Sequence, residues 1–165
     1  MVEGPSLVNP QATRPFAPGY GIKPASEGEL LAWSWAEERL TASRGYWLAT
    51  VRPDGRPHLS PIWGVWVADS FCFGCSDESS KARNLRASPR AYVSVESTFE
   101  PVAVEGIVEP IAGEMRDDYR RAYQAKYDVD VGAIEGTHLR LVPRVAFGSI
   151  DDERFPEIAT RWTFA

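Results

Sequence analysis

The sequence predicts a mainly β protein with a few helices, in which about six antiparallel strands close into a small barrel. Short apolar or alternating segments of strand length recur along the 165 residues, and turn signals separate most of them. No long helical crossover joins one strand to the next until late in the chain, which favours antiparallel neighbours. The predicted strands cover residues 46–52, 57–68, 71–75, 90–97, 102–111 and, with a break at Pro143, 138–141 and 145–150.

The first 25 residues are predicted to form an extended or partly disordered arm, and residues 26–165 a single domain. The arm carries five prolines within its first 24 residues and few periodic apolar positions, a composition typical of unstructured termini. Ser26 and Glu29 then form the capping-box pattern, a hydroxyl three residues before a carboxylate, which predicts a helix over residues 27–42.

Residues 46–68 are predicted to form a β-hairpin, because Pro53-Asp54-Gly55 is a strong turn signal between two strand patterns. Pro61 cannot donate a hydrogen bond to a neighbouring strand, so an edge or a bulge is expected there. The strand that follows carries Cys72 and Cys75, whose odd spacing places the thiols on opposite faces. We therefore expect two buried, reduced thiols rather than a zinc site or a redox pair.

The most informative segment is a short basic helix over residues 79–88, which lies between two strands and ends at Pro89. The start of a helix presents free backbone N–H groups and the positive end of the helix dipole. Lys81 and Asn84 stand three residues apart and so share a face. This combination suits a phosphate group. For Arg83 and Arg86, simple solvation of an exposed helix face explains the charge equally well.

The second half of the chain supplies the remaining elements. Gly106 interrupts the strand over residues 102–111 and indicates a kink or a close backbone approach. A second long helix is predicted over residues 113–128. The tyrosines on its apolar stripe are interpreted as packing residues with wet hydroxyl groups rather than as catalytic groups.

Composition excludes several function classes. The net charge of −5 argues against a nucleic-acid partner. No apolar run reaches the length of a membrane span, and the N-terminus has no signal-peptide core, so a cytoplasmic protein is expected. Dinucleotide, P-loop and nucleophile-elbow motifs are absent, as is any clustering of metal ligands. If the protein is an enzyme, a cofactor is expected to carry its chemistry. His58 and His138 could act as general bases, but partly wet strand positions explain both.

The order of several segments resembles the pyridoxamine-phosphate-oxidase-like flavin-binding split barrels. The first hairpin matches through Trp47-Leu48-Ala49-Thr50-Val51-Arg52-Pro53-Asp54-Gly55-Arg56-Pro57-His58, followed by Ser60-Pro61-Ile62-Trp63. Ser80-Lys81-Ala82-Arg83-Asn84-Leu85, then Ser88-Pro89-Arg90 and a strand, resembles the phosphate-binding segment of that family. Ala159-Thr160-Arg161-Trp162 is similar to a tail common in the deazaflavin-dependent branch. The resemblance covers residues 28 to 165.

The resemblance implies a six-stranded split β-barrel homodimer with a cofactor in a groove between the subunits. The cofactor would be FMN or the deazaflavin coenzyme F-420. Lys81 and Asn84 would hold its phosphate, next to Ser79 and Ser80. Ser79 falls where many relatives carry an arginine, so the phosphate site is expected to be weaker or reshaped. Four residues would line the ring or its phosphate-proximal side: Ser60, Pro61, Ile62 and Trp63.

Three functions are compatible with these observations. The leading hypothesis is an oxidoreductase that moves a hydride between the bound deazaflavin or FMN and a small organic acceptor. The first alternative is a carrier on the same barrel that binds flavin or haem without turnover. The second is a structural or interaction protein, for which the six tryptophans offer apolar anchors. Oxidation of pyridoxamine phosphate is not expected, because the substrate-phosphate residues of that enzyme are not found near the C-terminus.

Overall fold

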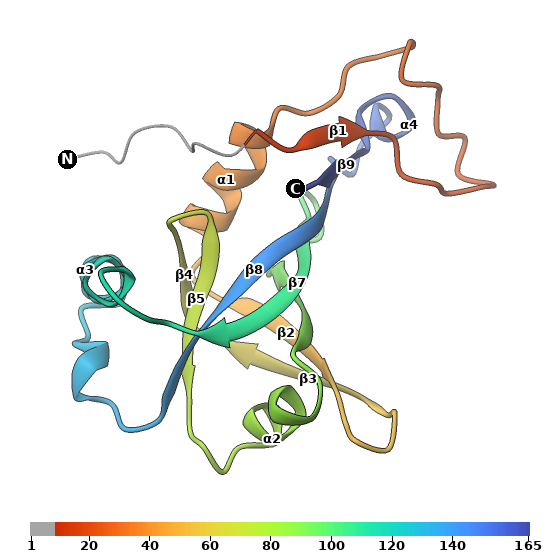
Figure 1. The fold of residues 1–165 in the computed structure, drawn as a ribbon. Helices are drawn as coiled ribbons and strands as arrows, with labels where there is room; N and C mark the ends of the chain where they lie inside the picture. The colour runs from red at the N-terminus through yellow and green to blue at the C-terminus, as the bar shows by residue number, and fades with distance from the viewer. Residues whose placement is uncertain (1–8) are drawn as a thin grey trace.

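A computed structural model describes residues 9–165 as one antiparallel sheet with helices at its edges and ends (Figure 1). Within these residues the strands are β1 (Gln11–Thr13), β2 (Tyr46–Val51), β3 (Pro57–Ile62), β4 (Gly64–Val67), β5 (Ser70–Cys75), β6 (Arg90–Val95), β7 (Val102–Pro110), β8 (Thr137–Gly148) and β9 (Thr160–Thr163). The helices are α1 (Trp33–Ala42), α2 (Ser80–Ala87), α3 (Met115–Tyr127), the short 3-10 helix η1 (Val131–Ala133) and α4 (Phe155–Ile158). The predicted mainly β, antiparallel class is confirmed.

The sheet divides along β8. Its main path runs β1-β9-β8-β7-β6-β2-β3, and β5 also pairs with β8 and carries β4. β8 pairs with β5 through residues 137–141 and with β9 through residues 145–148, while β7 occupies its other edge. One long strand therefore serves two branches, which lets the sheet curl around a common interior (Figure 1).

Residues 9–165 contain nine strands instead of the predicted six, for two reasons. The predicted strand over residues 57–68 divides at Trp63, because β3 pairs with β2 whereas β4 pairs with β5. Two short strands near the termini, β1 and β9, pair with each other and were not expected. Pro61 does lie on an edge, as predicted, since β3 is the last strand of the main path.

The break predicted at Pro143 is wrong, because β8 runs without interruption through this residue. Gly106 and Glu105 of β7 pair with Pro143 and Val145, so Arg144 has no partner opposite it in β7. Pro143 has no N–H group to donate, and the irregular pairing at this bulge lets the strand continue through it. A Cβ atom on Gly106 would lie 2.1 Å from the carbonyl oxygen of Val142, which confirms the predicted close approach.

Two apolar clusters hold the fold together. The larger fills the interior between the sheet branches and α1, and the smaller lies between α3 and the outer side of β4 and β5. Cys72 belongs to the smaller cluster and Cys75 packs against the larger, so the two thiols face opposite sides as predicted. Both are free, and Cys75 is only partly buried. The tyrosines of α3 line the smaller cluster, as predicted for packing residues: Tyr119, Tyr123 and Tyr127.

The predicted start of the first long helix is wrong by six residues. α1 begins at Trp33 rather than at residue 27, and Ser26 does not cap it. Gly28 instead has a φ of 74° and approaches Glu157, where a Cβ atom would lie 2.5 Å from the carbonyl oxygen. The N–H group of Leu31 donates to Thr160 Oγ1 over 2.9 Å. Residues 27–32 therefore bind the C-terminal segment, and this contact outweighs the local helix signal.

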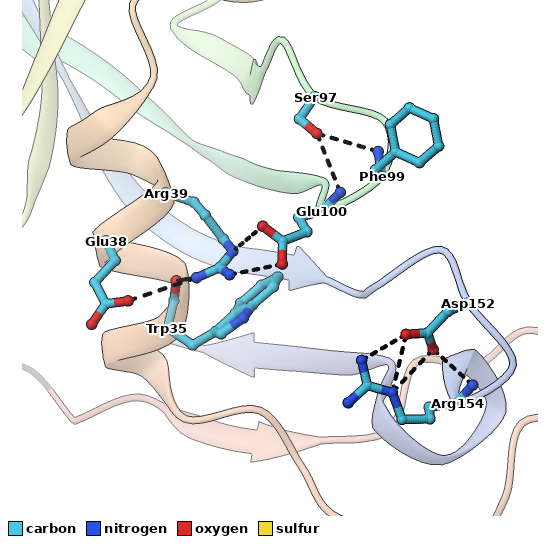
Figure 2. A network of polar contacts seen from close by, with 8 residues as sticks. All are labelled: Trp35, Glu38, Arg39, Ser97, Phe99, Glu100, Asp152 and Arg154. Atoms are coloured by element: carbon cyan, nitrogen blue, oxygen red, sulfur yellow. Dashed lines mark hydrogen bonds and ion pairs between the residues drawn. The ribbon is translucent and has the colours of Figure 1, made fainter.

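A polar network joins α1 to the loop between β6 and β7 (Figure 2). The Arg39 guanidinium donates to both carboxylate oxygens of Glu100 and lies 3.9 Å from the ring centroid of Trp35. Ser97 accepts hydrogen bonds from the backbone of Phe99 and Glu100, which fixes the loop. This network lies at the opposite end of the sheet from α2 (Figure 1).

The arm predicted over residues 1–25 is described in part, since residues 1–8 lie outside the described residues. From residue 9 onward it contributes β1, which pairs with β9 from Gln11↔Thr163 to Thr13↔Arg161. Among the described residues, no helix combines the length and the apolar character needed to cross a membrane.

Candidate functional site

The start of α2 is built as the sequence predicts. Ser79 caps the helix, and its hydroxyl group accepts a hydrogen bond from the backbone N–H of Ala82 over 3.2 Å. The helix then runs from Ser80 to Ala87. Because the hydroxyl group of Ser79 already satisfies one N–H group, the remaining free N–H groups and the helix dipole are what this end offers to an anion.

Asn84 connects α2 to the hairpin of β2 and β3. Its side chain is 3% exposed, and Nδ2 donates to Thr50 Oγ1 over 2.9 Å. Thr50 Oγ1 in turn lies 3.4 Å from Nδ1 of His58. An amide nitrogen carries two hydrogens, so Asn84 keeps one N–H for a ligand after bonding Thr50. This arrangement places the start of α2 next to the hairpin turn.

A cavity of about 320 Å³ opens between the hairpin turn and α2. Its lining residues are Arg52, Pro53, Asp54, Arg56, Ser80, Arg83 and Asn84. Asp54 forms an ion pair of 2.8 Å with Arg56, and the hydrogen bonds from Arg56 lower the pKa of that carboxyl group. Arg83 Nη2 donates to Ser80 Oγ over 3.3 Å. Three guanidinium groups and one carboxylate thus surround the cavity.

The structure separates Lys81 from this cavity. Ser80 and Asn84 line it, whereas Lys81 does not, although Lys81 and Asn84 stand three residues apart. Lys81 is partly buried, and its charge lies close enough to Cys75 to act on the thiol. Burial raises the pKa of the Cys75 thiol, and the hydrogen bond with Ser79 and the charge of Lys81 partly oppose that rise. Of the predicted phosphate residues, Ser80 and Asn84 therefore border the cavity and Lys81 lies outside it.

The predicted ring-lining segment lies on the edge strand β3 and just after it. Ser60 Oγ is buried and has no hydrogen-bond partner among the described residues. Pro61 is exposed, whereas the side chain of Ile62 packs into the larger core. Trp63 is 53% exposed. A buried hydroxyl without a partner is unusual in a folded protein and points to a missing ligand or water.

Trp63 is held by α3, a contact that the sequence did not reveal. The rings of Trp63 and Tyr127 stack in parallel with 4.7 Å between their centroids. The hydroxyl group of Tyr127 lies 2.9 Å from the carbonyl oxygen of Gly64 and 2.8 Å from that of Arg44, and it accepts from the Gly64 N–H over 3.1 Å. Three backbone contacts therefore fix the break between β3 and β4.

Lys126 lies beside this stack in a half-buried position. Its Nζ donates to the Tyr46 hydroxyl over 2.6 Å and lies 3.3 Å from the Gly64 carbonyl oxygen. Burial, with a smaller effect from the nearby charge of Arg44, lowers the pKa of Lys126 to about 8. Helical spacing predicted only that Lys126 or Tyr127 continues the apolar stripe of this helix, and the fold brings Tyr127 to Trp63 and Lys126 beside it.

The two histidines lie apart from each other. His58 lies on β3 beside Thr50, and His138 lies on β8 against the ring of Tyr119, with 5.6 Å between the ring centroids. Burial and the charge of Arg116 lower the pKa of His138. Among residues 9–165 there is no group of three or more histidine, cysteine, aspartate or glutamate side chains that could hold a metal ion.

Arg52 and Arg56 were not predicted as site residues, although they lie in the hairpin. Their signal was present as two arginines flanking Pro53-Asp54-Gly55. The sequence could not show that this turn folds back onto α2. The exposed face expected for Arg83 turns out to border the same cavity.

Comparison with known proteins places this geometry in a known context. A model of the pyridoxamine 5'-phosphate oxidase family matches residues 35–151. No curated protein matches the chain. Among solved structures, an F-420 reductase is 25% identical, with a TM-score of 0.53, and the match covers 67% of this chain and 94% of the reductase.

Two further structures share the fold. A FAD-binding protein from Mesorhizobium loti is 19% identical, with a TM-score of 0.57, over 82% of this chain and 96% of that protein. A heme binding protein from Mycobacterium smegmatis is 20% identical, with a TM-score of 0.60, over 70% of this chain and 53% of that protein. The match thus spans about half the length of the heme binding protein.

Proposed function

Because the chain belongs to the pyridoxamine 5'-phosphate oxidase family, we propose that it is an oxidoreductase that binds a flavin-type cofactor. The cofactor is FMN or the deazaflavin coenzyme F-420, and the reaction moves a hydride between this cofactor and a small organic acceptor. We favour the deazaflavin because the tail through Arg161 and Trp162 resembles that branch, and because the F-420 reductase is among the similar structures.

The observation that carries this proposal is the pairing of the capped start of α2, which lies beside a cationic cavity, with an unpartnered hydroxyl on β3. The start of α2 supplies helix N–H groups, the Lys81 ammonium group and one N–H of Asn84, all of which favour a phosphate, and the cavity beside it adds guanidinium groups. Ser60 Oγ is buried without a partner, which suits a hydrogen bond to a bound ligand. A phosphate-bearing ring compound satisfies both features.

When bound, the cofactor supplies the hydride chemistry, and the chain's own residues position and shield it. Lys81, Ser80 and Asn84 hold the ester phosphate at the start of α2. Ser60 offers its hydroxyl to the part of the cofactor that crosses β3. Trp63 borders the ring with an exposed indole face that the stack on Tyr127 keeps in place. The apolar neighbours of the ring exclude water from its reactive side.

The active form in this proposal is a homodimer. The outer face of the β2–β3 hairpin exposes Trp47, Val51 and Leu59, and Leu59 is 62% exposed. Trp47 pairs with Pro61 and Ala49 pairs with Leu59, so this face is a continuous apolar surface. A second copy would cover this face and, in this proposal, form the cofactor groove together with Trp63.

The site is tested by titrating FMN and coenzyme F-420 against the wild type and the Lys81→Ala variant. Loss of a charge-assisted contact to the phosphate is expected to weaken binding by about tenfold or more. Lys23→Ala is the matched control, because Lys23 is an exposed lysine in the N-terminal region that pairs only loosely with Glu27. Equal affinities of the wild type and Lys81→Ala would show that Lys81 does not bind the cofactor.

A carrier that binds flavin or haem without turnover is the second candidate. It is favoured by the heme binding protein of the same fold among the similar structures. Chemical reduction of the bound cofactor, followed by quinones, nitro compounds, unsaturated lipids or tetrapyrroles, separates the two functions. Reoxidation by one of these acceptors supports the oxidoreductase. Failure with every acceptor, in a protein that binds the cofactor tightly, favours the carrier.

A further inference from the structure

We propose that the cavity between the β2–β3 turn and α2 is a second anion subsite. It binds a phosphate or carboxylate group other than the ester phosphate that lies next to the flavin-type ring. This inference rests on the proposed function for the identity of the ligand, but the charge and the shape of the subsite stand on their own. Its consequence is a preference for cofactors that carry a second anionic group over FMN.

The residues that line the cavity carry an excess of positive charge. Arg52, Arg56 and Arg83 border it, and Asp54 is the single acidic residue in its lining. Asp54 forms the ion pair of 2.8 Å with Arg56, and Arg83 donates to the neutral Ser80 hydroxyl. The cavity therefore keeps an excess of positive charge in a protein whose net charge is −5. Guanidinium groups match the geometry of phosphate and carboxylate oxygens.

The cavity is larger than one phosphate group requires. Its volume is about 320 Å³, so it has room for more than one anionic group. One phosphate group fills a fraction of this space. A pyrophosphate or a short chain bearing carboxylates fills it better, because each anionic group can then meet its own guanidinium.

The cavity adjoins the start of α2, where the ester phosphate is proposed to bind. Ser80, Arg83 and Asn84 share one face of α2, and this face points to the hairpin turn. Lys81 does not line the cavity, and its charge acts on the Cys75 thiol. An ester phosphate held between Lys81 and the shared residues Ser80 and Asn84 therefore lies at the edge of the cavity, away from Arg52 and Arg56. A ligand that continues past this phosphate enters the cavity around the first turn of α2.

The hairpin turn presents its arginines from a fixed backbone. The N–H group of Arg52 donates to the carbonyl of Arg56 over 2.9 Å, and the N–H of Gly55 donates to the carbonyl of Arg52 over 2.8 Å. Gly55 has a φ of 86°, a conformation that closes this turn and that glycine adopts without strain. Asp54 also accepts from the Arg56 N–H over 3.1 Å. The turn is thus held in shape before any ligand arrives, which lowers the entropic cost of binding.

The test uses the double variant Arg52→Ala/Arg56→Ala, with Arg121→Ala on the exposed side of α3 as a control for the loss of a surface arginine elsewhere. Affinities are measured for riboflavin, FMN, FAD, coenzyme F-420 and inorganic pyrophosphate. FAD and coenzyme F-420 carry anionic groups beyond the first phosphate, and FMN does not. The double variant is expected to bind FAD or F-420 about tenfold more weakly and to lose pyrophosphate binding. Its affinity for FMN is expected to change by less than about threefold. Arg121→Ala is expected to change none of them.

The outcomes separate this inference from the proposed function. If the wild-type protein binds pyrophosphate but no flavin compound, the result supports the anion subsite and overturns the proposed function. Pyrophosphate binding without any gain for FAD or F-420 over FMN would assign the subsite to a separate anionic substrate. Unchanged affinity of the double variant for every probe, or no binding of pyrophosphate by the wild type, would overturn the inference.

Discussion

The hydroxyl group of Ser60 is buried and unpartnered, a state that costs stability unless a ligand restores the hydrogen bond. Ser60→Ala is therefore expected to leave the ligand-free protein as stable as the wild type, or more stable by up to about 1 kcal/mol. The same change is expected to weaken cofactor binding severalfold. Thermal unfolding with and without FMN or coenzyme F-420 measures both effects. A variant that is less stable without ligand and unaltered in affinity would show that Ser60 serves the fold alone.

Lys126 gives the protein a pH-dependent stability. Its pKa is lowered to about 8 in the folded state from an ordinary value of 10.5, mainly by burial. Between these two pH values the unfolded chain binds more protons, so this residue makes the free energy of unfolding rise with pH from about 8 upward. Burial raises the pKa of the Tyr46 hydroxyl, and that group reduces stability above about pH 10.

The informative pH range for this prediction is therefore about 8 to 10. Urea unfolding of the wild type and of Lys126→Met across this range measures the contribution of Lys126. Methionine keeps the length and apolar contacts of the side chain without its charge. The variant is expected to show a flatter dependence on pH, and identical slopes for the two proteins would contradict the prediction.

At the scale of elements, α3 holds the junction between β3 and β4 through Tyr127. Tyr127→Phe keeps the ring stacked on Trp63 but removes the hydroxyl that contacts Gly64 and Arg44. The expected loss is about 1–3 kcal/mol, because buried backbone groups lose a partner. Tyr127→Leu is expected to lose more, because the ring stacking disappears as well. Denaturant unfolding measures the stability of both variants, and near-wild-type stability of Tyr127→Leu would show that α3 does not hold the junction.

Element types were predictable from the sequence because their causes are local. The hairpin turn, the hydroxyl cap of α2 and the close backbone approach at Gly106 of β7 each depend on a few neighbouring residues, and all three are found. The start of α1 was mispredicted because Leu31 bonds Thr160, 129 residues away. Pro143 was taken as a break because the bulge that accommodates it is produced by pairing with Gly106 of another strand.

The candidate site was predictable in part for the same reason. The cap and basic face of α2 can be identified within ten residues of sequence. The approach of Arg52 and Arg56 to that helix depends on the packing of α2 against the hairpin through Asn84 and Thr50. The contact of Tyr127 with Trp63 joins residues 64 positions apart. Such contacts follow from the whole fold and leave no local pattern.

At the scale of the whole molecule, the split-barrel fold leaves the outer face of the β2–β3 hairpin apolar, and we expect a homodimer of about twice 18.3 kDa. Leu59→Glu places a charge on this face and is expected to give a folded monomer that binds the cofactor weakly. Phe99→Glu is the control, because Phe99 is also a well exposed apolar residue but lies on the loop between β6 and β7. Light scattering after size exclusion gives the masses. A monomeric wild type, or a dimeric Leu59→Glu protein, would contradict the proposed interface.

The most direct measurement is a side-by-side equilibrium titration of FMN and coenzyme F-420 with the wild-type protein, followed by the absorption and fluorescence of the ligand. We expect saturable binding of at least one of them, with one site per chain and a change in the ring spectrum as the ring leaves water. A folded, homogeneous protein that leaves both spectra unchanged at every concentration would contradict the assignment of a flavin-type cofactor to this chain.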